Sequence, residues 1–177
     1  VILDTTLRDG MQGQDISYTL DDKVQIARTM DTFGIDYIEG GFPLSSRKEA
    51  EFFQRIAKES LRHARVAAFG STRKPGGHAA GDPHVNALLA AETPAVVVVG
   101  KSWKAHVREV LQTTEDENLR MVSDTVATLK KAGREVIFDL EHFFDGWKDD
   151  PAFCRRVLAA ATEAGADCLV LCDTNGG

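Results

Sequence analysis

The chain has 177 residues, of which 43% are hydrophobic and 27% are charged, and its formal net charge is −6. This acidic balance, without a basic cluster among aromatic residues, argues against nucleic-acid binding, and no apolar run reaches the roughly 18 residues of a membrane span. The three cysteines, Cys154, Cys168 and Cys172, fit no zinc-binding spacing, and no signal peptide is visible, so we expect reduced thiols in a cytoplasmic protein.

Six stretches in chain order are predicted to be β-strands, and most are spaced by about 30 residues, the length of a βαβ unit. The run at 95–100 is apolar on both faces, as is typical of a parallel sheet covered on each side. The predicted strands are residues 1–7, 36–41, 65–70, 95–100, 135–140 and 167–172.

Five helices are predicted between these strands from their start and stop signals. The first has an apolar face that includes Leu20 and Val24, and it ends before Gly34. The second and fourth open with the pattern of a capping box at 46–49 and 114–117. The third and fifth open with Asp-Pro, at 82–83 and 150–151. The glycine-rich loop at 71–81, basic at Arg73 and Lys74, is expected to be mobile.

Repeated βα units are typical of either an open doubly wound sheet or a (β/α)8 barrel. No Gly-x-Gly-x-x-Gly follows the first strand, and polar residues follow almost every strand, which favours an α/β fold of the TIM-barrel type. Six strands are fewer than eight. We therefore expect residues 1–177 to form the N-terminal part of a single catalytic barrel domain, with about the first six βα units, truncated after the sixth strand.

Candidate site residues follow the ends of these strands. Arg8 is suited to hold a carboxylate or a developing enolate oxygen, and Asp9 is suited to bind a hard divalent ion or simply to pair with Arg8. Glu39 and Glu141 end apolar strands, where a structural ion pair and a functional role are equally plausible. The segment at 173–175 has the pattern of a turn or a helix cap. His106 and His142 lack a second histidine at ligand spacing. The residues alone indicate a metal-assisted enzyme of unspecified chemistry.

Several longer motifs carry a resemblance to one enzyme family. The sequence Thr-Leu-Arg-Asp-Gly-Met-Gln at 6–12 resembles the first-strand signature of the family that includes isopropylmalate, homocitrate and citramalate synthases and hydroxymethylglutaryl-CoA lyase. These are (β/α)8 barrel enzymes that use a divalent metal. The resemblance extends over the whole chain, and its combination of motifs is most similar to the bacterial (R)-citramalate synthase branch. The further motifs lie at 37–43, 100–103, 141–146 and 171–177.

This resemblance implies an acyltransferase that condenses acetyl-CoA with pyruvate to give citramalate, on a route to isoleucine. Asp9 would be one ligand of a divalent ion (Mg, Mn or Zn) that polarises the keto group. Arg8 would stabilise the oxygen charge that develops, Glu141 would border the keto acid, and Thr174 would bond its carboxylate. Gln12 and Glu39 match motif positions near the substrate. The expected partners are pyruvate and acetyl-CoA, with neither nucleic acid nor membrane, in a homodimer.

The sequence also departs from the family, because it does not contain the His-x-His pair that supplies the other metal ligands. We therefore expect the 177-residue segment alone to be inactive and to self-associate through its edge strands. The alternatives are a synthase acting on another 2-oxo acid, as in isopropylmalate or homocitrate synthesis, a lyase that catalyses the reverse cleavage, or a truncated barrel that serves only as an association module.

Overall fold

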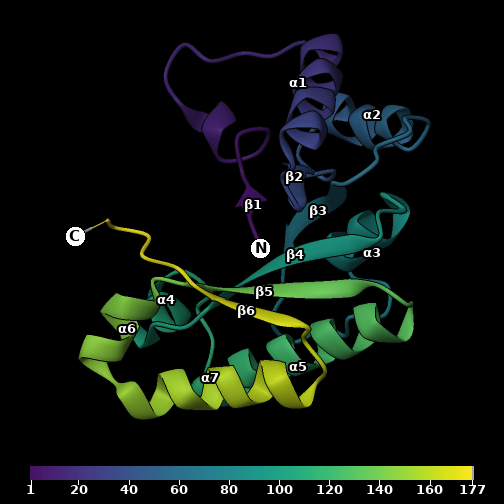
Figure 1. Cartoon of the computed structure of the whole chain (residues 1–177). Helices are drawn as coiled ribbons and strands as arrows, with labels where there is room; N and C mark the ends of the chain where they lie inside the picture. The colour runs from purple at the N-terminus through teal and green to yellow at the C-terminus, as the bar shows by residue number, and fades with distance from the viewer. Residues whose placement is uncertain (177) are drawn as a thin grey trace. The chain divides into compact units, whose positions relative to one another are not determined.

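The structure is a computed structural model, and it describes residues 1–176 (Figure 1). Hydrogen bonds join six strands in the order β1-β2-β3-β4-β5-β6, which is also their order in the chain. The pairs β1–β2, β2–β3 and β5–β6 are parallel. A doubly wound sheet reverses its strand order partway, so this sequential order confirms the barrel-type arrangement. The strands are β1 (Leu3–Asp4), β2 (Tyr37–Gly41), β3 (Arg65–Ser71), β4 (Ala95–Lys101), β5 (Glu135–Glu141) and β6 (Cys168–Leu171).

All five predicted helices are present, as α1, α2, α3, α5 and α7. Two further helices, α4 and α6, and a short 3-10 helix were not predicted, because elements of three to seven residues are too short to show an apolar period. The helices are η1 (Gly10–Gln12), α1 (Leu20–Phe33), α2 (Arg47–Ile56), α3 (Pro83–Ala90), α4 (Lys104–Glu109), α5 (Glu115–Lys131), α6 (Phe143–Asp149) and α7 (Pro151–Glu163). None of the described helices is long and apolar enough to cross a membrane.

The first strand is much shorter than the predicted stretch at 1–7. The Asp4 carboxylate accepts the backbone N–H of Thr6 at 2.8 Å, which starts a turn directly after the strand. The carbonyl of Thr5 then accepts the N–H groups of Arg8 and Gly10 at 3.0 and 3.1 Å. Arg8 and Asp9 therefore stand on a turn that follows β1.

The capping boxes predicted at 46–49 and 114–117 are only half formed. Ser46 accepts the N–H of Glu49 and Thr114 accepts that of Glu117, but both glutamate side chains bond other residues. A reciprocal box occurs instead at the start of α1, between Thr19 and Asp22.

The chain forms two compact units, and the first comprises residues 1–70 and 87–97. Its core lies where α1 and α2 cover β2, and Phe52 packs directly against the strand backbone, since a Cβ at Gly40 would lie 2.6 Å from its ring. Burial of such side chains is the main stabilising term in a unit of this size. The buried side chains here include Val24, Ala27, Ile38, Phe52, Phe53, Ile56 and Val66.

The second unit comprises residues 71–86 and those from 98 onward. In it α5 and α7 lie side by side along β5 and β6 (Figure 1). The apolar faces of both helices are buried, as their sequence periodicity predicted. Helices α4 and α6 lie together at the carboxyl end of β5 (Figure 1). The buried side chains here include Met121, Val122, Val126, Leu129, Phe138, Phe153 and Val157.

Candidate active site

In the first unit, Arg8 joins two carboxylates. Its Nε donates to Oε2 of Glu39 and its NH1 group donates to Oδ1 of Asp9, each at 2.9 Å. The guanidinium also lies 4.1 Å from the centre of the Phe69 ring, within the range of a cation–π contact. Glu39 is fully buried on β2, whereas the Asp9 side chain is 60% exposed. The buried Glu39 carboxylate thus fixes the Arg8 guanidinium, and the exposed Asp9 carboxylate lies beside it.

A cavity of about 270 Å³ lies next to this group. Gln12 reaches it from the 3-10 helix, and no residue that the structure describes bonds the Gln12 side chain, so its amide is available to a ligand. The walls combine polar groups with aromatic rings, as is usual for small-molecule sites. The cavity is lined by Leu7, Arg8, Met11, Gln12, Gly41, Phe42, Ser45, Ser46, Lys48, Glu49 and Phe69.

A buried ion pair supports one wall of this cavity. The ammonium of Lys23 donates to Glu49 at 2.7 Å, and both side chains are buried. Burial lowers the pKa of Lys23, and Glu49 opposes that shift. A Cβ at Gly41 would lie 1.8 Å from the Glu49 carboxylate, so the pair requires glycine there. Sequence reasoning missed Lys23, although it lies four residues before Ala27, on the apolar face of α1.

In the second unit, the ends of β4 and β5 are tied together by side chains. The Ser102 hydroxyl donates to the carbonyl of Glu141 at 2.7 Å, and the Asn118 amide donates to the carbonyl of Lys101 at 3.0 Å. The Lys101 ammonium bonds the Glu141 carboxylate. Lys101 is the last residue of β4, and no role was predicted for it from the sequence.

The motifs that follow β5 and β6 form one hydrogen-bonded cluster. The backbone N–H of His142 donates to the Thr174 hydroxyl at 2.9 Å. The Asp145 carboxylate bonds Nδ1 of His142 at 2.9 Å and accepts from the Asn175 amide at 2.8 Å. His142 has a φ of 52°, a strained conformation for a side chain of this kind, and the cluster holds it there. The predicted turn at 173–175 therefore positions Thr174 beside the Glu141 motif.

Two histidines that are far apart in the sequence meet at this end of the unit. The rings of His106 and His142 lie 4.5 Å apart, and the Trp103 ring lies 4.8 Å from that of His106. Nδ1 of His106 is buried without a hydrogen-bond partner and lies 4.0 Å from Oε2 of Glu141. Burial, and to a lesser extent the neighbouring His142 and Lys101, lowers the pKa of His106, which favours its neutral imidazole.

The residues described here do not by themselves form a metal site. Among residues 1–176, no group of three or more His, Cys, Asp or Glu side chains is placed to hold an ion. Asp9 fits as one ligand, because its exposed carboxylate is a hard oxygen donor of which one oxygen bonds Arg8. A divalent ion at Asp9 would therefore need further ligands.

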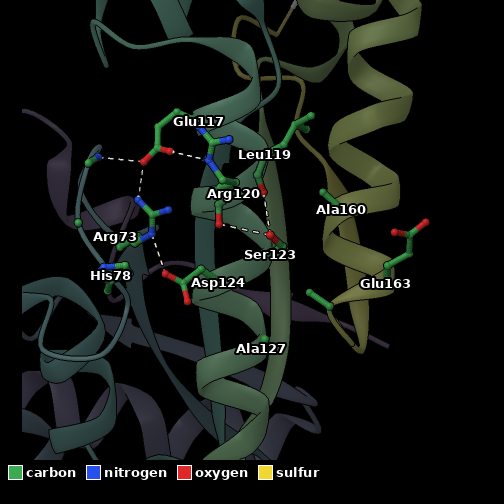
Figure 2. Close-up of a pocket in the computed structure, with 13 residues that line it drawn as sticks. Arg73, His78, Glu117, Leu119, Arg120, Ser123, Asp124, Ala127, Ala160 and Glu163 are labelled. Carbon is green, nitrogen blue, oxygen red and sulfur yellow. Dashed lines mark hydrogen bonds and ion pairs between the residues drawn. The ribbon is translucent and has the colours of Figure 1, made fainter.

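A second cavity, of about 830 Å³, lies between the 71–81 loop and helices α5 and α7 (Figure 2). Arg73, only 4% exposed, bonds Glu117 at 2.7 Å and Asp124 at 2.8 Å, and Glu117 also accepts the N–H of Gly76 at 2.9 Å. These bonds anchor the loop that we expected to be mobile. Because they occupy the Arg73 guanidinium, we assign this cavity no catalytic role.

The structure places Arg8, Asp9, Gln12 and Glu39 in the first unit. It brings Arg8, Asp9 and Glu39 into direct contact there. It places Glu141 and Thr174 in the second unit, at the adjoining ends of β5 and β6. That the two groups form one site stays a prediction.

Comparison with known proteins identifies a matching family model and relatives of this chain. The model of the HMGL-like family matches residues 1–177. The (R)-citramalate synthase of Aquifex aeolicus is 52% identical over 99% of this chain, and homocitrate synthase AksA of Methanopyrus kandleri is 34% identical over 99%. The chain spans 33% and 41% of the length of these two relatives.

A solved structure supports the fold. The hydroxymethylglutaryl-CoA lyase of Bacillus subtilis superposes with a TM-score of 0.79 over 100% of this chain and 59% of its own, at 19% identity. At that identity the likeness concerns the fold alone. Its agreement with the sequential parallel strand order confirms that the chain covers part of a TIM barrel.

Proposed function

The chain belongs to the HMGL-like family, and from this membership we propose that the protein is an acyltransferase that condenses acetyl-CoA with pyruvate to give (R)-citramalate, a step of isoleucine biosynthesis. The observation that carries the proposal is the 52% identity to an (R)-citramalate synthase over nearly the whole chain. The identity to a homocitrate synthase over the same extent is 34%. Residues 1–177 then belong to one catalytic barrel domain of a cytoplasmic homodimer.

In this proposal Arg8 stabilises the transition state. A guanidinium has five N–H donors, and its described carboxylate partners accept from Nε and NH1. The donors that remain can hold the oxygen on which negative charge develops as the new carbon–carbon bond forms. Glu39 fixes the guanidinium from the buried side, so that little reorganisation is needed during the reaction.

Glu141 and Thr174 bind the 2-oxo acid. The Thr174 hydroxyl accepts from His142, which leaves its own proton free to bond the substrate carboxylate. Glu141 borders the keto group, and Gln12 offers its amide from the cavity beside Arg8. Asp9 would be one ligand of a divalent ion, which when bound supplies Lewis-acid polarisation of the keto oxygen.

The experiment is a substrate panel with the intact protein. Thiol release from acetyl-CoA would be measured with pyruvate, 2-oxoisovalerate and 2-oxoglutarate, and the products would be identified by chiral chromatography and mass spectrometry. We expect a kcat/KM for pyruvate at least about tenfold above the others, which corresponds to about 1.4 kcal/mol of discrimination. A preference for either longer acid would identify an isopropylmalate or homocitrate synthase. Cleavage of hydroxymethylglutaryl-CoA would identify a lyase, and no turnover of any substrate would favour the association module.

A further inference from the structure

The ammonium of Lys101 has hydrogen-bonding capacity that the described residues do not use. Lys101 is the last residue of β4, and its side chain is 20% exposed. A lysine ammonium has three N–H donors. Among residues 1–176, the only group bonded to this ammonium is the Glu141 carboxylate. Further donors therefore remain for an anionic ligand at the carboxyl ends of the strands, where barrel enzymes bind their substrates.

The surrounding backbone holds this pair in place. Ser102 and Asn118 are both fully buried, and they donate to the carbonyls of Glu141 and Lys101 respectively. These bonds fix the backbone of Lys101 and Glu141, so only the flexible side chain of Lys101 needs to move when a ligand binds. Such a preformed arrangement reduces the entropy lost on binding.

A second partner is available to Glu141 if the ammonium turns away. Nδ1 of His106 is buried without a partner and lies 4.0 Å from Oε2 of Glu141. A neutral imidazole carries a proton on one nitrogen, and a small rotation would let Nδ1–H donate to Glu141. The carboxylate would then stay satisfied while Lys101 bonds a ligand.

The charges of the cluster point to the class of ligand. Glu141 and Asp145 are acidic side chains that would repel an anion, whereas the Lys101 ammonium, which bonds Glu141, would attract one. We propose that the Lys101 ammonium binds the carboxylate of the 2-oxo acid, together with the Thr174 hydroxyl. This inference rests on the proposed function and adds a residue to its binding site. Charge-assisted bonds of this kind are stronger than neutral ones and discriminate an acid from its amide.

The test compares a charged ligand with its neutral analogue in the intact protein. Binding of pyruvate and of its amide, 2-oxopropanamide, would be measured by equilibrium dialysis for the wild type and for Lys101→Met, Lys101→Arg and Lys148→Met. We expect Lys101→Met to weaken pyruvate binding about 10- to 100-fold while binding of the amide changes less than about threefold. Lys101→Arg keeps the preference for the acid. Lys148 is exposed on α6 without a described partner, so Lys148→Met should behave as the wild type.

Three results would overturn the inference. One is a Lys101→Met variant that keeps the wild-type ratio of pyruvate to amide affinity. Another is an equal loss for both ligands that Lys101→Arg does not restore, which would indicate a structural role. The third is weaker binding of acetyl-CoA in the same dialysis experiment while pyruvate binding is unchanged, which would indicate that the ammonium binds the phosphates of that cosubstrate. If the wild type prefers another 2-oxo acid, the proposed function fails, and the same acid–amide comparison made with that acid still decides the role of Lys101.

Discussion

Arg8 connects a fully buried carboxylate with an open one, and this double contact depends on the planar fork of its guanidinium. A lysine at the same position keeps the charge but cannot bond Glu39 and Asp9 with parallel donors or stack on Phe69 in the same way. Replacement would leave the buried Glu39 with a weaker partner. The residue is therefore both a structural and a catalytic candidate, and the two roles can be measured separately.

We expect Arg8→Lys to lower the free energy of unfolding by about 1–3 kcal/mol, because Glu39 loses a charge-assisted bond in a buried place. Turnover should fall about 100-fold, as it does when one donor to a developing oxyanion is removed. Urea unfolding and steady-state kinetics would measure the two effects. Arg47→Lys is the matched control, since the Arg47–Glu51 pair is exposed, and its cost should stay below about 0.5 kcal/mol. A kinetic effect no larger than the control's would remove Arg8 from the catalytic site.

At the scale of elements, the contacts of Glu117 show how α5 and the loop at 71–81 stabilise each other. Glu117 lies in the first turn of α5, and it bonds Arg73, the N–H of Gly76 and Arg120 (Figure 2). The Arg73 guanidinium is the largest cause that lowers the pKa of Glu117 to about 2, from an ordinary value of 4.5. The charged form is therefore favoured in the folded protein, and the loop depends on it.

We expect Glu117→Gln to destabilise the protein by about 2–3 kcal/mol at pH 7. A carboxyl whose pKa is lowered on folding stabilises the folded state at pH values above its unfolded pKa. That contribution is lost as the pH falls from 4.5 toward 2, so the difference between variant and wild type should narrow in acid. Urea unfolding at pH 7 and pH 3.5 would measure both values. Glu163→Gln, at the rim of the same cavity, should leave the free energy of unfolding unchanged at both pH values. A difference independent of pH would show that the charge of Glu117 is not what holds the loop.

The elements that the sequence predicted are those whose causes are local. Caps such as Asp150, which accepts the N–H of Phe153, and the apolar periods of α1, α5 and α7 can be read within a few residues. Helices α4 and α6 could not be predicted, since they are too short to show an apolar period. The partners of Glu49 and Glu117 could not be predicted either. Their side chains bond Lys23 and Arg73, which lie 26 and 44 residues away, instead of completing the local capping boxes.

Candidate site residues divide in the same way. Arg8, Asp9, Glu39, Glu141 and Thr174 were proposed from motifs and strand ends, and their roles stay predictions. In contrast, His106 contacts His142, and Lys101 bonds Glu141, only because the fold brings α4 and the end of β4 to the end of β5. Residues separated by 36 to 40 positions give no pattern that a single sequence shows, because only the fold brings them together.

For the whole molecule, the metal role of Asp9 is the proposal that most needs a test of its own. Its carboxylate is exposed, and its pair with Arg8 is of a kind that contributes at most about 1 kcal/mol. A structural role therefore predicts a small effect of losing the charge. A role as ligand predicts a large effect on metal binding with little change in stability, since asparagine keeps the shape of the side chain but not its charge.

In the intact protein, we expect Asp9→Asn to weaken binding of Mn²⁺ by at least about tenfold, because a neutral amide is a poorer ligand than a carboxylate for a hard ion. Calorimetric titration of the metal alone measures this without relying on turnover. The thermal midpoint should move by less than about 2 °C, as for other exposed substitutions. Asp15→Asn is the control, because Asp15 is exposed on the same segment and asparagine tolerates its positive φ. Equal metal affinity in Asp9→Asn and Asp15→Asn would assign Asp9 to Arg8 alone, and the divalent ion would then have to be held entirely by other residues of the protein.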